Sequence, residues 1–207
     1  MDAVTISYAI TVCDELEEVN RLITFLSERK RDMDNIVVLL DNTKKKAQLE
    51  ILLQGFAQAN IITLATGSFD GNFSEWKNKL NSLCTGEYII NIDADEVPTG
   101  EFMQGMPLIL ELNDIDVYGV SRSNLVEGLT KEHVTKWRWS VDEFSRVNWP
   151  DTQFRVYRNC EEIKWEGKVH ERVVGFKTRT LLPDDMYFHH NKTIAKQEKQ
   201  NNYYNTL

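Results

Sequence analysis

The chain has 207 residues, a formal net charge of −8 at pH 7 and the composition of an ordinary soluble globular protein. An acidic chain lacks the basic face that binding to duplex nucleic acid needs, and its longest apolar runs fall far short of the ~20 residues of a membrane span. Three widely spaced cysteines fit neither a disulfide framework nor a zinc knuckle. We therefore expect a cytoplasmic protein without a transmembrane segment, and a peripheral position at the inner face of a membrane stays open.

Apolar strands and amphipathic helices alternate through the first half of the chain. Apolar runs predict strands at 4–12, 36–40, 61–64 and 87–92, and apolar residues at helical spacing predict helices at 15–30, 43–56 and 74–83. Strands that are apolar on both faces and alternate with helices are typical of an α/β fold, in which helices cover a mostly parallel central sheet. Asp14 can cap the first helix.

The second half of the chain is more varied. We expect a helix that Pro107 disturbs, a short strand, an aromatic and strand-like stretch, and a polar helical tail, at 99–112, 117–120, 136–179 and 193–207. The sequence shows no repeat, low-complexity segment or linker that would divide it. The prediction is therefore a single domain, 1–207. Its first half, 1–98, is of a size that can bind a nucleotide, and it precedes a mixed half at 99–207.

Three acidic residues, Asp93, Asp95 and Glu96, follow the fourth predicted strand. Like charges at the end of a buried strand repel each other and lose hydration, so folding alone gives little reason for them. A divalent cation such as Mg²⁺ or Mn²⁺ would explain them, because hard ions prefer carboxylate oxygens and share them with substrate phosphates. The alternative is a loop of solvated acids in which Asp95 or Glu96 caps the helix near Thr99.

Other polar residues also follow strands of the predicted sheet. Ligands of open α/β sheets bind outside the carboxyl ends of the strands, so Cys13 to Glu15, Asp41 and the acidic cluster are expected to converge on one crevice. Asp41 could accept the imino N–H of a pyrimidine base, or simply form an Asx-turn. Lys77 carries a flexible charge suited to a diphosphate, or belongs to a solvated helix face.

Two histidine segments in the second half are further candidates. His170 and Glu171 could supply a general base or a metal ligand, and a surface pair is the alternative. His189 and His190 could supply an imidazole to the same ion as the acidic cluster, or form a polar turn.

Together these segments, in this order, resemble the family 2 glycosyltransferases of the GT-A fold. The resemblance is most specific from Gly86 to Glu96, which is similar to the family's approach to its Asp-x-Asp motif. The segments at 153–158, 165–171 and 190–203 look like those of a bacterial subgroup that includes lipopolysaccharide-core glucosyltransferases. The implied fold is GT-A, with a Rossmann-like, mostly parallel central sheet, flanking helices and a mixed acceptor-side half.

The resemblance implies an inverting, metal-assisted enzyme that moves a sugar from a nucleotide-diphosphate donor, usually a UDP-sugar, to an acceptor hydroxyl. The implied nucleotide-binding residues are Thr11, Cys13, Glu15, Asp41, Lys77 and Asp93. The implied ligands of Mg²⁺ or Mn²⁺ are Asp93, Asp95 and His190, with His190 preferred over His189. A glycan, a lipid-linked molecule or a protein could be the acceptor.

Inversion requires one base that takes the proton from the attacking hydroxyl. Glu171 is the first candidate for this base and Asp151 the second. A base in a partly apolar pocket is expected to have a raised pKa. The metal and Lys77 would stabilise the negative charge that develops on the departing diphosphate.

Two other functions stay open at this point. The acidic cluster also fits the nucleophile motif of haloacid-dehalogenase-like phosphatases, with Asp93 attacking phosphorus and Asp95 acting as acid and base. That fold places the motif on its first strand, whereas three strand–helix units precede it here, and Asp184-Asp185 is a poor match for the second acidic pair. The other alternative is a non-catalytic module that binds a nucleotide-sugar on the same fold.

Overall fold

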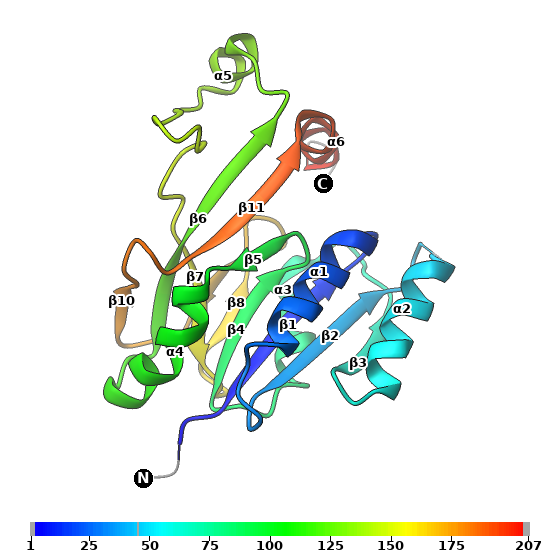
Figure 1. The fold of residues 1–207 in the computed structure, drawn as a ribbon, viewed down its shortest axis with the longest axis vertical. Coiled ribbons are helices and arrows are strands. Elements are labelled where there is room, and N and C mark those ends of the chain that lie inside the picture. Colours follow the sequence, from blue (N-terminus) through cyan, green and yellow to red (C-terminus); the bar gives the residue numbers. More distant parts are fainter. Residues whose placement is uncertain (1–2, 45, 205–207) are drawn as a thin grey trace.

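The computed structural model describes residues 3–44 and 46–204, which form an α/β fold (Figure 1). Its strands are β1 (Ile6–Val12), β2 (Asn35–Asp41), β3 (Thr63–Gly67), β4 (Tyr88–Asp93), β5 (Glu96–Pro98), β6 (Val117–Glu127), β7 (Gln153–Arg158), β8 (Lys164–Glu166), β9 (Arg172–Val174), β10 (Arg179–Leu181) and β11 (Tyr187–Thr193). Its helices are α1 (Leu16–Ser27), α2 (Ala47–Gln58), α3 (Phe73–Asn81), α4 (Gly100–Leu112), α5 (Lys131–Trp137) and α6 (Ile194–Tyr204).

The central sheet is mixed. Its strand order is β3-β2-β1-β4-β7-β6-β11-β5, and β10 also pairs with β6. The first four of these strands are parallel to one another, β7 is antiparallel to both β4 and β6, and β11 runs parallel to β6. A separate hairpin is formed by β8 and β9. This architecture confirms the predicted α/β fold, with a parallel first half and a mixed second half.

Each face of the sheet has its own hydrophobic core. Successive residues of a strand point to opposite faces, and β1 divides its side chains accordingly. Tyr8 and Ile10 belong to the core that α1, α2 and α4 close, while Ala9 belongs to the core closed by α3 and the β8–β9 hairpin. Trp165 of the hairpin lies in this second core. The strands are therefore fixed from both sides, which sets the positions of their carboxyl ends.

The second half differs from the sequence prediction in three places. The strand expected at 117–120 continues to Glu127, because its polar upper half pairs with β11 although it lacks an apolar pattern. The helix α5 was not predicted, because it buries none of its residues and so has no periodic signal; it lies mostly before the stretch expected to be strand-like and overlaps it only at Lys136 and Trp137. Pro107 lies inside one uninterrupted helix, α4.

Two strands extend beyond the rest of the sheet and carry helices at their upper ends. We call residues 121–149 and 187–204 the upper lobe; it contains the upper half of β6, then α5, β11 and α6 (Figure 1). The polar tail is helical as predicted, up to the last described residue of α6, and positions 205–207 lie outside the described residues. Within the described ranges, no helix is long and apolar enough to span a membrane.

Candidate functional site

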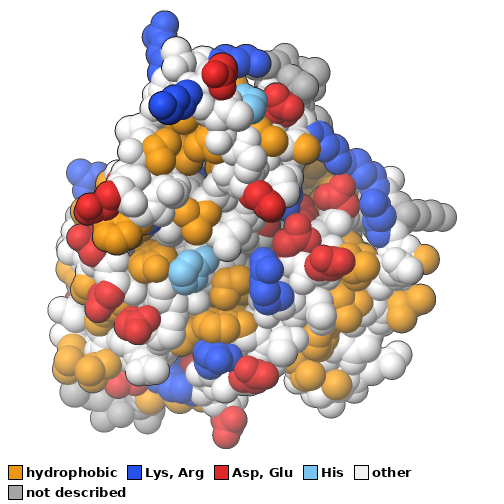
Figure 2. Space-filling model, turned by 45° about the horizontal axis from the view of Figure 1, so that its top comes forward, with side chains coloured by type: hydrophobic (Ala, Val, Ile, Leu, Met, Phe, Trp, Pro, Cys, Tyr) orange, Lys and Arg blue, Asp and Glu red, His pale blue; other side chains and the backbone are white. Residues whose placement is uncertain are grey.

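A cleft of about 1200 Å³ lies between the carboxyl ends of β1, β2 and β4 and the upper lobe. The preferred candidates for nucleotide binding, metal binding and the base all line it: Thr11, Cys13, Glu15, Asp41, Lys77, Asp93, Asp95, Asp151, Glu171 and His190. Figure 2 shows acidic and basic side chains gathered next to each other on this face. The fold thus brings together residues from both halves of the chain.

The carboxylate of Glu15 holds the loop after β1. Its Oε2 accepts hydrogen bonds from the backbone N–H groups of Cys13 at 2.8 Å and Asp14 at 3.0 Å. Burial raises the pKa of Glu15, although these hydrogen bonds favour its charged form. The predicted cap at Asp14 is wrong, because the N-cap residue of α1 is Glu15 and it makes no side-chain capping bond.

Asp41 ends β2 with its carboxylate in the cleft. Oδ1 accepts hydrogen bonds from the backbone N–H groups of Thr43 at 3.0 Å and Phe69 at 3.1 Å, and Oδ2 accepts one from the Thr43 hydroxyl at 2.8 Å. Burial opposes ionisation, but these bonds bring the pKa of Asp41 below its ordinary value. The Asx-turn that the sequence allowed is present, and the carboxylate stays charged at neutral pH.

Asp93 and Glu96 bind arginines from the second half of the chain. Asp93 Oδ2 accepts a hydrogen bond from Nη2 of Arg155 at 2.7 Å. Glu96 Oε1 lies 3.3 Å from Arg155 and 3.2 Å from Arg122. Glu96 and Arg155 are 0% and 2% exposed. Because water cannot solvate these charges, each ion has to be stabilised by its partner. Burial opposes ionisation of Asp93, yet Arg155 holds its pKa well below the usual range.

The alternative in which Asp95 or Glu96 caps the following helix is wrong. The N-cap residue of α4 is Thr99, whose Oγ1 accepts a hydrogen bond from the N–H of Phe102 at 3.2 Å. Glu96 instead closes the turn between β4 and β5, because its Oε2 accepts a hydrogen bond from the N–H of Asp93 at 3.0 Å. Glu96 is therefore the buried counter-ion of two arginines.

Asp95 lies next to two side chains of the upper lobe. Its Oδ2 is 3.4 Å from Nε2 of His190 and 3.1 Å from Nζ of Lys196. Burial opposes ionisation, but the hydrogen bond and charge of His190 lower the pKa of Asp95 far below its usual value. The alternation of β11 turns His189 to the opposite face, where its ring packs against Tyr187. His190 is thus the histidine of this pair that lines the cleft.

Asp95 and His190 are suitably placed to bind a metal ion. Two ligands about 2.1 Å from one ion and at right angles lie roughly 3 Å apart, which is close to the 3.4 Å between Asp95 Oδ2 and His190 Nε2. Across residues 3–44 and 46–204, no three His, Cys, Asp or Glu side chains are grouped to hold a metal. The pair therefore fits an ion such as Mg²⁺ or Mn²⁺, which would take its other ligands from a diphosphate and water.

Glu171, the first candidate for the base, lies in the turn of the β8–β9 hairpin. Its Oε1 is 2.7 Å from Nζ of Lys77, and the same Nζ lies 3.8 Å from Asp93 Oδ1. Lys77 is only 6% exposed, with its ammonium 4.3 Å from the ring centroid of Trp165. Lys77 is therefore a buried cation between two carboxylates, and the solvated helix face that the sequence left open is wrong.

Asp151, the second candidate, is strongly bound by its neighbours. Its Oδ2 accepts hydrogen bonds from Nε and Nη2 of Arg122 at 3.0 and 2.7 Å, and from Nδ2 of Asn124 at 2.7 Å. Burial opposes ionisation, but Arg122 and Asn124 lower the pKa of Asp151. The raised pKa expected for a base is therefore wrong for Asp151, and its carboxylate is a poor proton acceptor.

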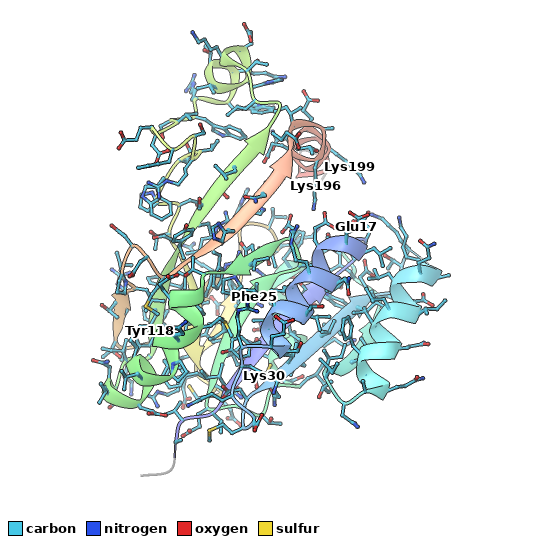
Figure 3. All side chains as sticks on the ribbon, viewed as in Figure 1. Glu17, Phe25, Lys30, Tyr118, Lys196 and Lys199 are labelled. Atoms are coloured by element: carbon cyan, nitrogen blue, oxygen red, sulfur yellow. The ribbon has the colours of Figure 1, made fainter. Side chains whose placement is uncertain are left out.

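Four functional neighbours were missed from the sequence. Arg122, Asn124 and Arg155 lie on strands whose spatial neighbours the sequence does not reveal. The one available signal was Arg155, which stands between the apolar residues Phe154 and Val156 of β7. Lys196 belongs to a polar helix, where a lysine usually faces water. Figure 3 shows Lys196 and Lys199 extending from α6 towards α1. Nζ of Lys196 lies 3.2 Å from Oε1 of Glu18 in the first turn of α1.

A mostly parallel sheet with an inserted antiparallel strand, and a carboxylate-lined cleft at the strand ends, define a protein of the GT-A class. The family model for glycosyl transferase family 2 matches residues 7–164, which is more than half of the chain. The chain therefore belongs to glycosyl transferase family 2. This match removes the phosphatase alternative for the acidic cluster. Comparison with curated proteins finds no match.

Solved structures of similar fold include TarS from S. aureus. Residues 1–349 of TarS share 13% sequence identity with this chain at a TM-score of 0.62, covering 90% of this chain and 60% of that one. The TarS complex with UDP-GlcNAc gives 14% identity, a TM-score of 0.63 and coverage of 91% and 58%. The complex with UDP gives 14%, 0.63, 90% and 60%. The chain thus spans about three fifths of these TarS chains, and the likeness shows a shared fold.

Proposed function

We propose that this chain is an inverting glycosyltransferase that moves a sugar from a UDP-sugar to an acceptor hydroxyl, with help from Mg²⁺ or Mn²⁺. The supporting observation is that one cleft contains three suitable groups. Asp41 is an ionised carboxylate suited to bind the uracil ring, Asp95 and His190 are a pair suited to bind a metal, and Glu171 is a carboxylate suited to take a proton. The TarS structures of similar fold contain UDP or UDP-GlcNAc, which supports a nucleotide-sugar donor.

The nucleotide would occupy the end of the cleft beside β1 and β2. Asp41 is charged and fixed by three hydrogen bonds, so it can accept the imino N–H of uracil. Thr11, Cys13 and Glu15 line the same end. Asp93 serves the ribose or the metal in this proposal, and its bond to Arg155 fixes its direction.

The cations of the cleft would stabilise the leaving diphosphate. A bound Mg²⁺ or Mn²⁺ ion supplies positive charge to the diphosphate oxygens. Lys77 and Lys196 add charge from opposite sides of the cleft, one from α3 and one from α6. The bond between the anomeric carbon and the diphosphate oxygen breaks while the acceptor oxygen attacks the opposite face of the sugar, and Glu171 takes the acceptor's proton.

Lys77 connects these events because it binds the proposed base. In the ligand-free chain its ammonium lies 2.7 Å from Glu171. A diphosphate at the metal pair offers Lys77 a further and more highly charged partner. Donor binding thus weakens the Lys77–Glu171 pair and leaves Glu171 available for the acceptor.

The metal site is tested by titrating UDP with and without Mn²⁺ by calorimetry. We expect Mn²⁺ to tighten UDP binding, and Asp95→Ala to abolish this dependence on metal. If UDP binding is indifferent to both Mn²⁺ and Asp95→Ala, the metal site is wrong. Asp114→Ala is a matched control, because the Asp114 side chain is 98% exposed and forms a surface ion pair with Arg158.

Turnover is tested by hydrolysis of a panel of nucleotide-sugars with each metal. Release of the nucleotide from one donor supports the enzyme and names the sugar, and no turnover with any donor favours a non-catalytic binding module. Products with retained anomeric configuration would exclude Glu171 as the base of an inverting reaction. The free cysteines among the described residues fit the cytoplasmic location that we propose.

A further inference from the structure

One row of residues crosses three strands beneath the cleft. In the sheet register Glu96 of β5 lies opposite His190 of β11, which in turn lies opposite Asn124 of β6. All three side chains are buried, with Glu96 fully so. Asp151, although far away in the sequence, joins this row through Asn124. His190 is therefore connected to Asp151 by one buried amide.

The hydrogen bonds of Asn124 determine which way its amide group points. Its Nδ2 lies 2.7 Å from Asp151 Oδ2 and 3.4 Å from the carbonyl oxygen of Val147. An ionised carboxylate and a backbone carbonyl both accept hydrogen bonds and cannot donate them. The NH₂ group of Asn124 must therefore face these two oxygens, and its Oδ1 must face the other way.

The orientation of Asn124 in turn decides which nitrogen of His190 carries a proton. Nδ1 of His190 lies 2.6 Å from Oδ1 of Asn124, and this oxygen can only accept. Nδ1 must therefore be the donor and keep its hydrogen. Nε2, on the other side of the ring, faces Oδ2 of Asp95 at 3.4 Å.

Asp151 is itself held by Arg122, which also pairs with the buried Glu96. Arg122 donates two hydrogen bonds to Asp151 Oδ2, and its Nη1 donates one to Glu96 Oε1 at 3.2 Å. Burial opposes the charge of Arg122, but Glu96 and Asp151 raise its pKa. The carboxylate of Asp151 is thus fixed and charged, so Asn124 has a permanent acceptor to orient it.

We infer that Asn124, oriented by Asp151, is the positioning residue that keeps the proton on Nδ1 of His190 and turns Nε2 toward Asp95. This gives Asp151 a role in orientation in place of proton transfer. The protonation pattern is a property of the chain alone. Its consequence for a metal ion rests on the proposed function, because Nε2 is then the nitrogen that can bind the ion beside Asp95.

The protonation pattern is tested without metal by long-range ¹H–¹⁵N NMR of the His190 ring over a range of pH. In the wild-type chain we expect Nδ1 to remain protonated after the ring has become neutral. In Asn124→Leu, which keeps the shape but removes the acceptor, we expect the remaining proton to move to Nε2, where Asp95 can accept it. A neutral wild-type ring with bare Nδ1, or identical spectra for both proteins, would overturn the inference.

The consequence is tested by Mn²⁺ titration in the presence of UDP, followed by electron paramagnetic resonance. We expect Asn124→Leu to weaken Mn²⁺ binding by about 10- to 100-fold. In the double variant Asn124→Asp/Asp151→Asn, the new carboxylate at position 124 accepts from Nδ1 and from the new amide at position 151, so affinity should return to within a few-fold of wild type. Ser123→Ala, one residue away and on the other face of β6, is the control for damage to the strand.

The outcomes separate the two proposals. If wild type binds Mn²⁺ and Asn124→Leu binds it equally well, the positioning role is wrong while the metal site stands. If wild type fails to bind Mn²⁺ but keeps the proton on Nδ1, the metal site is wrong while the role of Asn124 stands. Failure of the double variant to recover, with a normal circular dichroism spectrum, would also contradict the positioning role.

Discussion

At the scale of single residues, the carboxylates of the cleft differ in the cations that neutralise them. Asp93 and Glu96 are bound to Arg155, which stays charged at every pH a protein experiences and is fixed in a buried position. Asp95 and Glu171 are bound to lysine or histidine. A metal ion can replace these cations beside Asp95, and a diphosphate can compete with Glu171 for Lys77. The arginine partner of the first pair is therefore expected to stay in place when a ligand binds, whereas ligands can displace the partners of the second pair.

The proposed base gives a prediction at this scale. Glu171→Gln keeps the size of the side chain but cannot take a proton. We expect it to lower kcat by about 10²- to 10⁴-fold, with UDP affinity within a few-fold of wild type, because Lys77 rather than Glu171 would contact the diphosphate. Steady-state kinetics and UDP calorimetry measure the two effects.

A control for Glu171→Gln lies in the same hairpin. Glu166→Gln changes an exposed carboxylate that forms a surface pair with Lys164 at 3.4 Å. We expect its kcat and its UDP affinity to equal those of wild type. If Glu171→Gln retains wild-type kcat, another residue is the base.

At the scale of elements, two helices with the same kind of cap differ in how they are anchored. Thr99 caps α4, which buries Phe102 and Met106, and its hydroxyl also donates to the carbonyl of Asp185 at 2.9 Å. Thr130 caps α5, which buries none of its residues. A helix without buried contacts opens locally at little cost to the rest of the molecule.

The caps are therefore expected to differ in their effect on global stability. Thr99→Ala should lower the free energy of unfolding by about 1–2 kcal/mol. Thr130→Ala should change it by less than about 0.5 kcal/mol, because α5 can fray without exposing a core. Urea titration followed by tryptophan fluorescence measures both, and equal losses for the two variants would contradict this account.

The helix α6 brings a competing cation to the proposed metal pair. Nζ of Lys196 lies 3.1 Å from Asp95 Oδ2 and 3.2 Å from Glu18. Lys196→Met should raise the affinity for Mn²⁺ in the absence of nucleotide by about 3- to 10-fold, because Asp95 loses a partly exposed counter-ion. Mn²⁺ titration followed by electron paramagnetic resonance measures this change in affinity.

The control for this effect comes from the same helix. The side chain of Lys199 is 79% exposed and lies 3.9 Å from Asp14. Lys199→Met should leave Mn²⁺ binding unchanged. Equal or weaker Mn²⁺ binding by Lys196→Met than by wild type would show that Lys196 does not compete with the metal.

At the scale of the whole molecule, acid is expected to destabilise the fold through the cleft. The pKa values of Asp93, Asp95 and Asp151 are lowered in the folded chain, so the unfolded chain binds more protons. The stability that these groups supply is present above about pH 4, the ordinary pKa of aspartate, and is lost as the pH falls through their folded values.

Asp95→Asn should remove part of this acid dependence. The difference in unfolding free energy between wild type and Asp95→Asn should be largest at pH 7 and should shrink towards pH 3. Guanidinium titrations at several pH values measure it, with Asp114→Asn as the exposed control. A difference that stays constant with pH would mean that the charge of Asp95 does not stabilise the fold.

The sequence predicted the parallel half of the fold because its strands are buried on both faces and its helices alternate with them. It also located the acidic side of the cleft, since position at a strand end is a local property. It could not identify Arg155 or Arg122 as partners, because β7 and β6 are brought near β4 by strand pairing between residues far apart in the chain. The polar upper half of β6 and the exposed α5 carry no apolar pattern, so neither was predicted.

The strand β7 lies between β4 and β6 in the sheet but comes late in the sequence, and this affects how the chain folds during synthesis. β7 pairs with β4 and delivers Arg155 to Asp93 from 62 residues further along the chain. A nascent chain that ends before β7 therefore has β4 as an open sheet edge, with a cluster of carboxylates that lacks Arg155. Unpaired edges and unneutralised buried charges both oppose folding. The first half is thus expected to stay only partly ordered on the ribosome until β7 has emerged.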